Sequence, residues 1–181
     1  MNPSKQQTSA PADPAGAPAD AGTVTLLPHK TDAPAFLKAC HLTANSSARA
    51  NARIRVRTWL TMGRWAGNVD QASRVAGELV DNAVSHGRPF PGVDGLVVTL
   101  RVFAFADTGD LAIEVDDALA SFLKFAEVAN QSGEARRNVN GLWWVAHYRG
   151  RLSWDVKRDV THTVIGKTVQ ALLPQTWGGA A

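Results

Sequence analysis

Glu78 and Asn82 form the pair whose residue types and spacing are best suited to chemistry. They lie four positions apart in a stretch, residues 69–85, whose apolar residues recur with a helical period. Residues four apart lie one above the other on a helix, so the carboxylate and the carboxamide share a face. Such a pair can coordinate Mg²⁺ through oxygen ligands and orient a water molecule. On spacing alone, a solvated polar helix face is the simpler interpretation.

The elements that position this pair follow from the hydrophobic pattern. Residues 47–65 predict a helix before the one at 69–85, and Gly87 is a natural stop for the second helix. Alternating residues predict two β-hairpins, one over 96–105 and 111–115 and a closing one over 151–156 and 164–173. The other predicted elements are a short strand at 23–27, a helical turn or two at 33–41, a loop with a short helix at 118–138, and a helix at 141–148.

Strands that cluster in hairpins favour an α+β two-layer sandwich over a doubly wound fold. The first 22 residues are rich in Pro and Ala and predict a disordered tail before a single domain at 23–174, with a flexible end at 175–181. No apolar run approaches the roughly 20 residues that span a bilayer, and the start of the chain lacks the apolar stretch of a signal peptide. We therefore expect a cytoplasmic protein without a membrane partner. Cys40, the single cysteine, excludes a disulfide framework and a cysteine-based zinc cluster.

The run GELVDNAVSHG at 77–87, which follows a basic helix, resembles the N box of the GHKL (histidine kinase/HSP90-like) ATPase superfamily. The small stand-alone anti-sigma factor serine kinases are the most similar branch. The resemblance implies a Bergerat-type ATP-binding fold, in which helices cover one face of a mixed sheet. It also implies ATP and Mg²⁺ as cofactors. In the family, the glutamate acts as general base or orients the water and the asparagine binds Mg²⁺, and these roles would fall on Glu78 and Asn82.

Three further segments resemble family motifs. Asp117, with Asp116 as the second choice, follows a strand where the family aspartate accepts a hydrogen bond from the adenine amino group. Gly141 and Leu142 match the end of the lid motif, which presents backbone amides to the phosphates. Thr168, in Gly-Lys-Thr on the last strand, matches the hydroxyl that helps to hold adenine.

Arginines form a stripe along the first long helix, at positions 49, 53, 57 and 64. Between Ala44 and Asn68 the sequence contains no acidic residue. An uncompensated basic face steers acidic partners, so Arg49, Arg53, Arg57 and Arg64 predict a surface for an acidic protein. A solvated helix face is the other interpretation. The net charge is only +3 and no nucleic-acid motif is present, so direct nucleic-acid binding is not expected.

Two functions remain open. The resemblance implies an ATP-dependent serine/threonine kinase that regulates transcription by partner switching, with a sigma factor or an anti-anti-sigma (STAS-domain) protein as partner, and it is compatible with a homodimer. The alternative is a degenerate GHKL-fold module that binds proteins and has lost or weakened nucleotide binding. Ala118 and Val139 favour the alternative, because the family has a glycine-containing or Ser/Pro segment at the first position and a glycine at the second.

Overall fold

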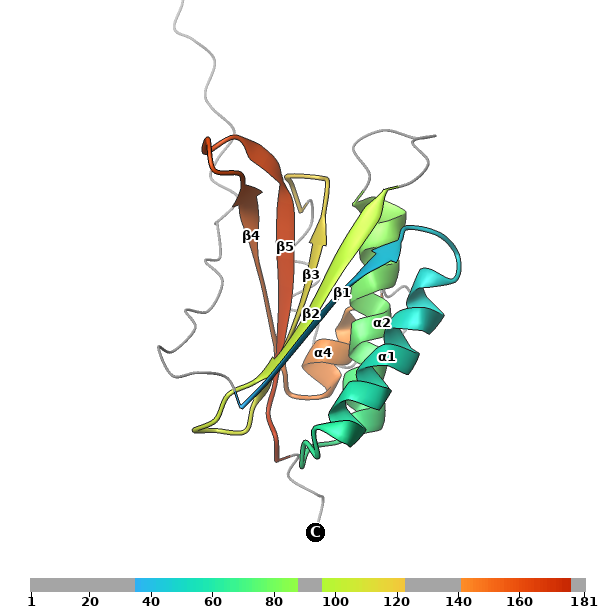
Figure 1. Ribbon diagram of the computed structural model, residues 1–181, viewed down its shortest axis with the longest axis vertical. Coiled ribbons are helices and arrows are strands. Elements are labelled where there is room, and N and C mark those ends of the chain that lie inside the picture. Colours follow the sequence, from blue (N-terminus) through green and yellow to red (C-terminus); the bar gives the residue numbers. More distant parts are fainter. Residues whose placement is uncertain (1–34, 88–95, 123–140, 177–181) are drawn as a thin grey trace, which may run out of the picture.

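The computed structural model describes residues 35–87, 96–122 and 141–176. In chain order its elements are β1 (Phe36–Thr43), α1 (Ala48–Met62), α2 (Val69–His86), β2 (Val97–Ala104), β3 (Leu111–Asp117), α4 (Trp143–His147), β4 (Arg151–Arg158) and β5 (Val164–Leu173). The five strands form one sheet in the order β1-β2-β3-β5-β4 (Figure 1).

Every pairing between the described strands is antiparallel, so the expectation of a mixed sheet is wrong for this part of the chain. The connection between β1 and β2 explains why. Two helices, α1 and α2, return the chain to the end of the sheet where β1 finished, and Thr43 at the end of β1 pairs with Val97 at the start of β2. Hairpins then make the β2–β3 and β4–β5 pairs antiparallel as well.

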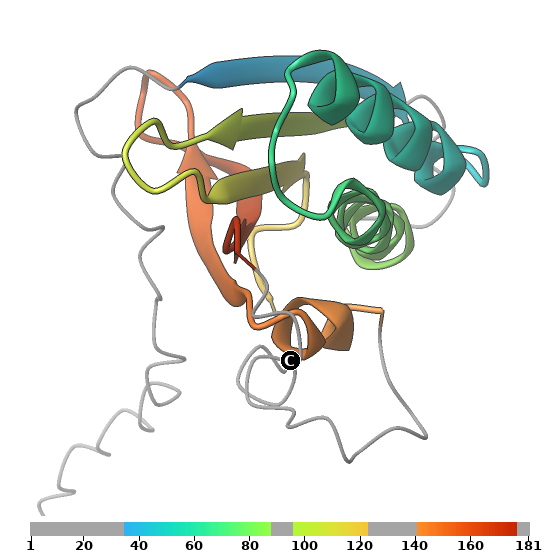
Figure 2. The ribbon, with the colours of Figure 1, turned by 90° about the horizontal axis from the view of Figure 1, so that it is seen from below.

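The helices lie on one face of the sheet (Figure 2). Helix α1 packs on β1, α2 packs on the central strands β2, β3 and β5, and α4 packs against α2, β4 and β5. Apolar side chains fill the space between the two layers. Among the largest fully buried ones are Leu60 and Val56 of α1, Leu79, Val75 and Val80 of α2, and Leu100, Val102, Leu111 and Ile113 of the sheet. The predicted two-layer α+β architecture is confirmed.

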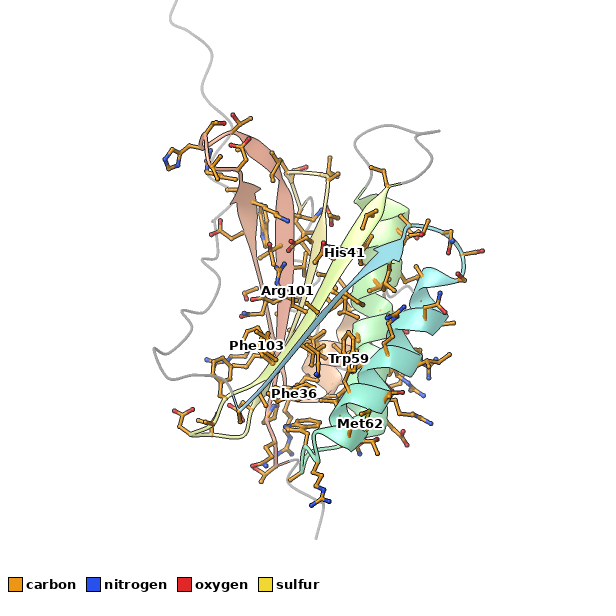
Figure 3. The ribbon with its side chains drawn as sticks, viewed as in Figure 1. Phe36, His41, Trp59, Met62, Arg101 and Phe103 are labelled. Atoms are coloured by element: carbon orange, nitrogen blue, oxygen red, sulfur yellow. The ribbon has the colours of Figure 1, made fainter. Side chains whose placement is uncertain are left out.

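The other face of the sheet carries a polar network. Arg101 donates to Glu114 and to both carboxylate oxygens of Asp116, at 2.5–2.8 Å. Asp116 also accepts from Lys157 and, at 2.8 Å, from Thr168. Burial raises the pKa of Asp116, but the hydrogen bonds from its cationic neighbours outweigh burial and hold that pKa below its ordinary value. Figure 3 labels Arg101 and Phe103, which are two positions apart on β2 and therefore lie on the same face. Arg101 belongs to the polar part of this face, and Phe103 belongs to its apolar part.

Most of the predicted elements are confirmed, with boundaries shifted by a few residues. The helix predicted at 47–65 ends at Met62, and the one at 69–85 extends to His86. The helical turns predicted at 33–41 are wrong, because Phe36–Thr43 is the edge strand β1. The strand at 23–27, the tail at 1–22 and most of the loop at 118–138 lie outside the described residues. Within the described ranges, no helix combines the length and apolar character needed to cross a membrane.

Helix α2 has a side-chain N-cap whose removal gives a direct stability test. Asn68 accepts a hydrogen bond from the backbone N–H of Gln71 at 3.1 Å, which satisfies one of the free donors at the helix start. Asn68→Ala is expected to lower the free energy of unfolding by about 1 kcal/mol. Ser47→Ala is the matched control, because Ser47 at the start of α1 makes no side-chain cap bond and, among the described residues, its hydroxyl contacts only the exposed side chains of Asn45 and Asn51. Equal losses in urea denaturation of the two variants would contradict the assigned cap.

Candidate functional site

A cleft of about 450 Å³ lies where α1, α2 and the start of α4 meet. Its described lining residues are Arg49, Glu78, Asp81, Asn82, Ser85, His86, Gly141, Trp143 and Trp144. The structure therefore brings together residues predicted from two separate motifs, Glu78 and Asn82 from one and Gly141 from the other. Trp143 and Trp144 stack on each other, with ring centroids 4.2 Å apart, and both are half-buried. One side of the cleft is thus aromatic, and the α2 side is polar.

Glu78 does not lie on a solvated helix face. Its side chain is only 7% exposed, and Arg49 of α1 donates a hydrogen bond to its carboxylate. Arg49 also lies 3.6 Å from the carboxylate of Asp81. Gly141 covers Glu78 closely: a Cβ atom at position 141 would lie 1.8 Å from Glu78 Oε2. The carboxylate predicted as general base is therefore buried, hydrogen-bonded to a cation and packed beneath a glycine.

Asp117, the predicted adenine acceptor, lies beyond the end of α2 and is not among the described residues lining the cleft. A Cβ atom at Gly87 would lie 2.5 Å from its carboxyl carbon, so the carboxylate sits directly against the helix end. Lys167 of β5 donates from Nζ to Asp117 Oδ1 at 2.8 Å, and the two side chains are only 3% and 2% exposed. Lys167 also donates to the carbonyl oxygen of Leu119 at 3.1 Å, and its ammonium lies 5.8 Å from the ring centre of Phe122.

The ionisation of Asp117 reflects this enclosure. Burial raises the pKa of Asp117 to about 6, although the charge and hydrogen bond of Lys167 and the N–H of Leu119 act in the opposite direction. One carboxylate oxygen, Oδ2, is buried without a hydrogen-bond partner in the described part of the chain. A carboxylate in this setting is already engaged by one internal cation and is shielded from the cleft.

Two other predicted residues lie away from the cleft. Thr168 is on the opposite face of the sheet from Asp117, because neighbouring residues on a strand point to opposite faces. Its hydroxyl donates to Asp116, the second choice for the adenine aspartate, which belongs to the polar network on the face that the described helices leave uncovered. Leu142 is 2% exposed and belongs to the apolar core between the layers.

The arginine stripe is compensated at Arg49 and Arg57, which corrects the expectation of a face without acids. The sequence around α1 has no acidic residue, but α2 supplies them: Glu78 and Asp81 contact Arg49, and Asp70 pairs with Arg57. Arg53 has no acidic partner among the described residues. Arg64 lies beyond the end of α1, with a φ of 50°, and so is not part of the helical face. The partner surface itself stays a prediction.

Sequence reasoning missed the role of Lys167. The signal that reveals it is strand register, because Lys167 is the cross-strand partner of Asp117 in the β3–β5 pair. The hydrophobic pattern of the sequence does not show the register between two strands whose paired residues are 50 positions apart. Arg49 was predicted as a partner contact, whereas the structure makes it the cation of the cleft.

The cleft offers few free oxygen ligands. Arg49 contacts the carboxylates of both Glu78 and Asp81, and Asn82 adds an amide oxygen to the same wall. The described residues contain no group of three or more His, Cys, Asp or Glu side chains arranged to hold a metal ion. Magnesium prefers several hard oxygens in octahedral geometry, so this donor set fits the ion poorly unless phosphate oxygens contribute.

Comparisons with known proteins assign no family. No family model matches the sequence, and no curated protein matches it significantly. Among solved structures, the chain is similar to one described as "Mycobacterial sensor histidine kinase MprB". The two share 16% sequence identity with a TM-score of 0.42, over 76% of this chain and 97% of that one. A likeness at this level leaves the function to be argued from the residues of the chain itself.

Proposed function

We propose that this protein is a regulatory module that acts by binding a protein partner and does not transfer phosphate. The observation that carries the proposal is the buried Lys167–Asp117 pair. An adenine amino group would have to reach Asp117 Oδ2, the oxygen without a partner among the described residues, in a nearly inaccessible site, or displace the ammonium that donates to Oδ1 at 2.8 Å. Separating such a pair leaves a buried charge without its partner, which costs several kcal/mol.

The state of Glu78 supports the same conclusion. A general base needs a free lone pair within hydrogen-bond reach of the proton that it removes. The Glu78 carboxylate accepts from Arg49 and lies against Gly141, so a hydroxyl group has little access to it. The residue types of the ATPase motifs are present, but the side chains of Glu78, Asp117 and Thr168 make hydrogen bonds within the protein. This arrangement fits the degenerate GHKL-fold alternative. By that resemblance, the partner would be a sigma factor or an anti-anti-sigma protein.

An ATP-dependent kinase is the second candidate, and the cleft is the observation that favours it. Glu78, Asn82 and Gly141 lie together around a polar space of about 450 Å³. Phosphate groups carrying Mg²⁺ would meet Asn82 and Arg49 there. This candidate requires adenine to be bound without the Asp117 contact, to reach the buried Asp117 Oδ2, or to displace Lys167 from Oδ1.

Calorimetric titration with Mg²⁺-ATP and Mg²⁺-ADP separates the two candidates. We expect no saturable binding at millimolar nucleotide and no incorporation of labelled γ-phosphate into a sigma factor or a STAS-domain protein. Saturable binding with a specific mutational pattern would overturn the proposal. In that pattern, Asp117→Asn weakens ATP and ADP alike, Asn82→Ala weakens ATP only when Mg²⁺ is present, and Glu78→Ala abolishes transfer but spares binding.

A further inference from the structure

A shallow apolar groove of about 320 Å³ runs along the outer side of α1 and shares no lining residue with the cleft. It is lined by Ala50, Arg53, Ile54, Arg57 and Ser73, and we call it the α1 groove. Ala52, Val56 and Leu60 direct α1 toward the core, which leaves Ile54 on the outside with 64% of its surface exposed. A large aliphatic side chain exposed in a groove between two helices is a natural contact for an apolar side chain of a partner.

The rim of the α1 groove is cationic. The side chain of Arg53 lies over α2 at Gly77. A Cβ atom on residue 77 would lie only 2.7 Å from Arg53 Cγ, so the glycine provides the space for the arginine side chain. No acidic side chain in the described part of the chain pairs with Arg53. Arg57 pairs with Asp70, but their side chains are 58% and 77% exposed. Exposed pairs contribute only about 0–1 kcal/mol, so a carboxylate of a partner can replace Asp70 at little cost.

The spacing of the two arginines indicates the shape of the partner. Arg53 and Arg57 are four residues apart and therefore project from one side of α1 about 5–6 Å from each other. Carboxylates four residues apart on a second helix have the same spacing. An apolar residue of the partner helix, placed between its two carboxylates, would then face Ile54 and Ala50. The groove thus matches a helix that has one apolar stripe bordered by acidic residues.

We infer that the α1 groove binds an acidic amphipathic helix of a partner protein, with an apolar side chain against Ile54 and carboxylates on Arg53 and Arg57. The inference rests on the proposed function, because it supplies the surface by which a non-catalytic regulator would act. It also reduces the arginines that we expect to contact the partner to two of the four in the stripe, because Arg49 belongs to the cleft and Arg64 lies outside the helix.

Fluorescence anisotropy with two labelled synthetic peptides tests the inference on the full chain. The first peptide is a helix of about 18 residues with a leucine stripe bordered by glutamates, and the second has serine in place of each leucine. We expect the leucine peptide to bind at least tenfold more tightly. Arg53→Glu should weaken its binding by tenfold or more, and Ile54→Ser by about five- to tenfold.

Arg55→Glu is the matched control, because Arg55 is an exposed arginine of the same helix that does not line the groove. It makes the same charge change and should alter peptide binding by less than about threefold. The inference is overturned if Arg55→Glu weakens binding as much as Arg53→Glu, if the serine peptide binds equally well, or if neither peptide binds at millimolar concentration. Tighter binding of single-stranded DNA or of anionic lipid vesicles than of the leucine peptide would also overturn it.

The same protein sample separates this inference from the proposed function. Phosphate transfer by the wild-type chain would overturn the proposed function and leave groove binding of the peptide unchanged. Loss of peptide selectivity without any nucleotide binding would overturn only the α1 groove. The Arg53 and Ile54 variants retain Glu78, Asp117 and Lys167, so their nucleotide titrations should match that of the wild-type protein.

Discussion

Lys167→Met is expected to lower the free energy of unfolding by about 3–5 kcal/mol near pH 8. The substitution keeps most of the volume of the side chain but removes the cation that pairs with Asp117. Breaking a buried pair on one side is costly because the remaining charge stays desolvated. The side chains are 3% and 2% exposed, so solvent cannot replace the lost ammonium. Urea denaturation monitored by tryptophan fluorescence measures the loss.

The cost of Lys167→Met should depend on pH. Burial raises the pKa of folded Asp117 to about 6 from an ordinary value of 3.8. Folded wild-type protein therefore binds more protons than the unfolded chain between these values, and its stability falls as pH rises through this range. Lys167 lowers the pKa of Asp117, so removing Lys167 raises that pKa further. The pH range over which the folded state loses stability as pH rises then extends to higher pH. Near pH 5 the carboxyl group is protonated, and the variant should lose much less stability.

The double variant Lys167→Met, Asp117→Asn is the control. It removes both charges and should recover most of the stability lost at pH 8, because a neutral pair of similar size carries no desolvated ion. If the single variant loses equal stability at pH 5 and pH 8, the ammonium would matter through its contacts with Leu119 and Phe122 instead. That result would contradict the assigned ion pair.

Gly166→Ala is expected to cost at least about 3 kcal/mol, for steric and conformational reasons together. Gly166 has a φ of 151°, and a Cβ atom there would lie 2.0 Å from the backbone oxygen of Asp117. Backbone cannot rotate away as a side chain can, so the β3–β5 pair would separate near Asp117. The position also lies beside the irregularity in the β4–β5 register, where Gly166 pairs with Lys157.

Gly63→Ala serves as the matched glycine substitution. Gly63 has an ordinary φ of −75°, and the atoms nearest to its new Cβ, at 2.8 and 2.9 Å, belong to the ring of Phe36, which is only half-buried. A ring can shift, so we expect a loss of at most about 1 kcal/mol. Thermal or urea unfolding of both variants gives the comparison. Equal losses would show that the close approach at Gly166 is not rigid.

The sequence predicted the elements whose burial pattern is regular. Helix α2 and the two hairpins carry clear periods of 3.6 and 2, and all three are present. Residues 33–41, most of which lie in strand β1, were predicted as a helical turn or two. As an edge strand its exposed positions outnumber its buried ones, so its conformation depends on pairing with β2 and not on local pattern.

The candidate site was predicted in residue type but not in bonding state. Glu78 and Asn82 share a helix face and a cleft, as their spacing predicted. The partners that change their chemistry come from distant parts of the chain. Arg49 reaches Glu78 from 29 residues away, and Lys167 reaches Asp117 from 50 residues away. Such contacts depend on helix packing and strand register, which a single sequence does not display.

The position of β5 in the sheet also constrains how the protein is made. Strand β5 is the last of the described strands in sequence order, yet it lies between β3 and β4 and supplies Lys167 to Asp117. During synthesis, β3 and β4 therefore lack the strand that pairs with both of them until residues 164–173 have left the ribosome. Until then Asp117 is a carboxylate without its cation, and one edge of β3 has no strand with which to form hydrogen bonds. Folding of this domain is thus expected to be completed only after β5 has emerged, when the ion pair and the inner strand of the sheet form together.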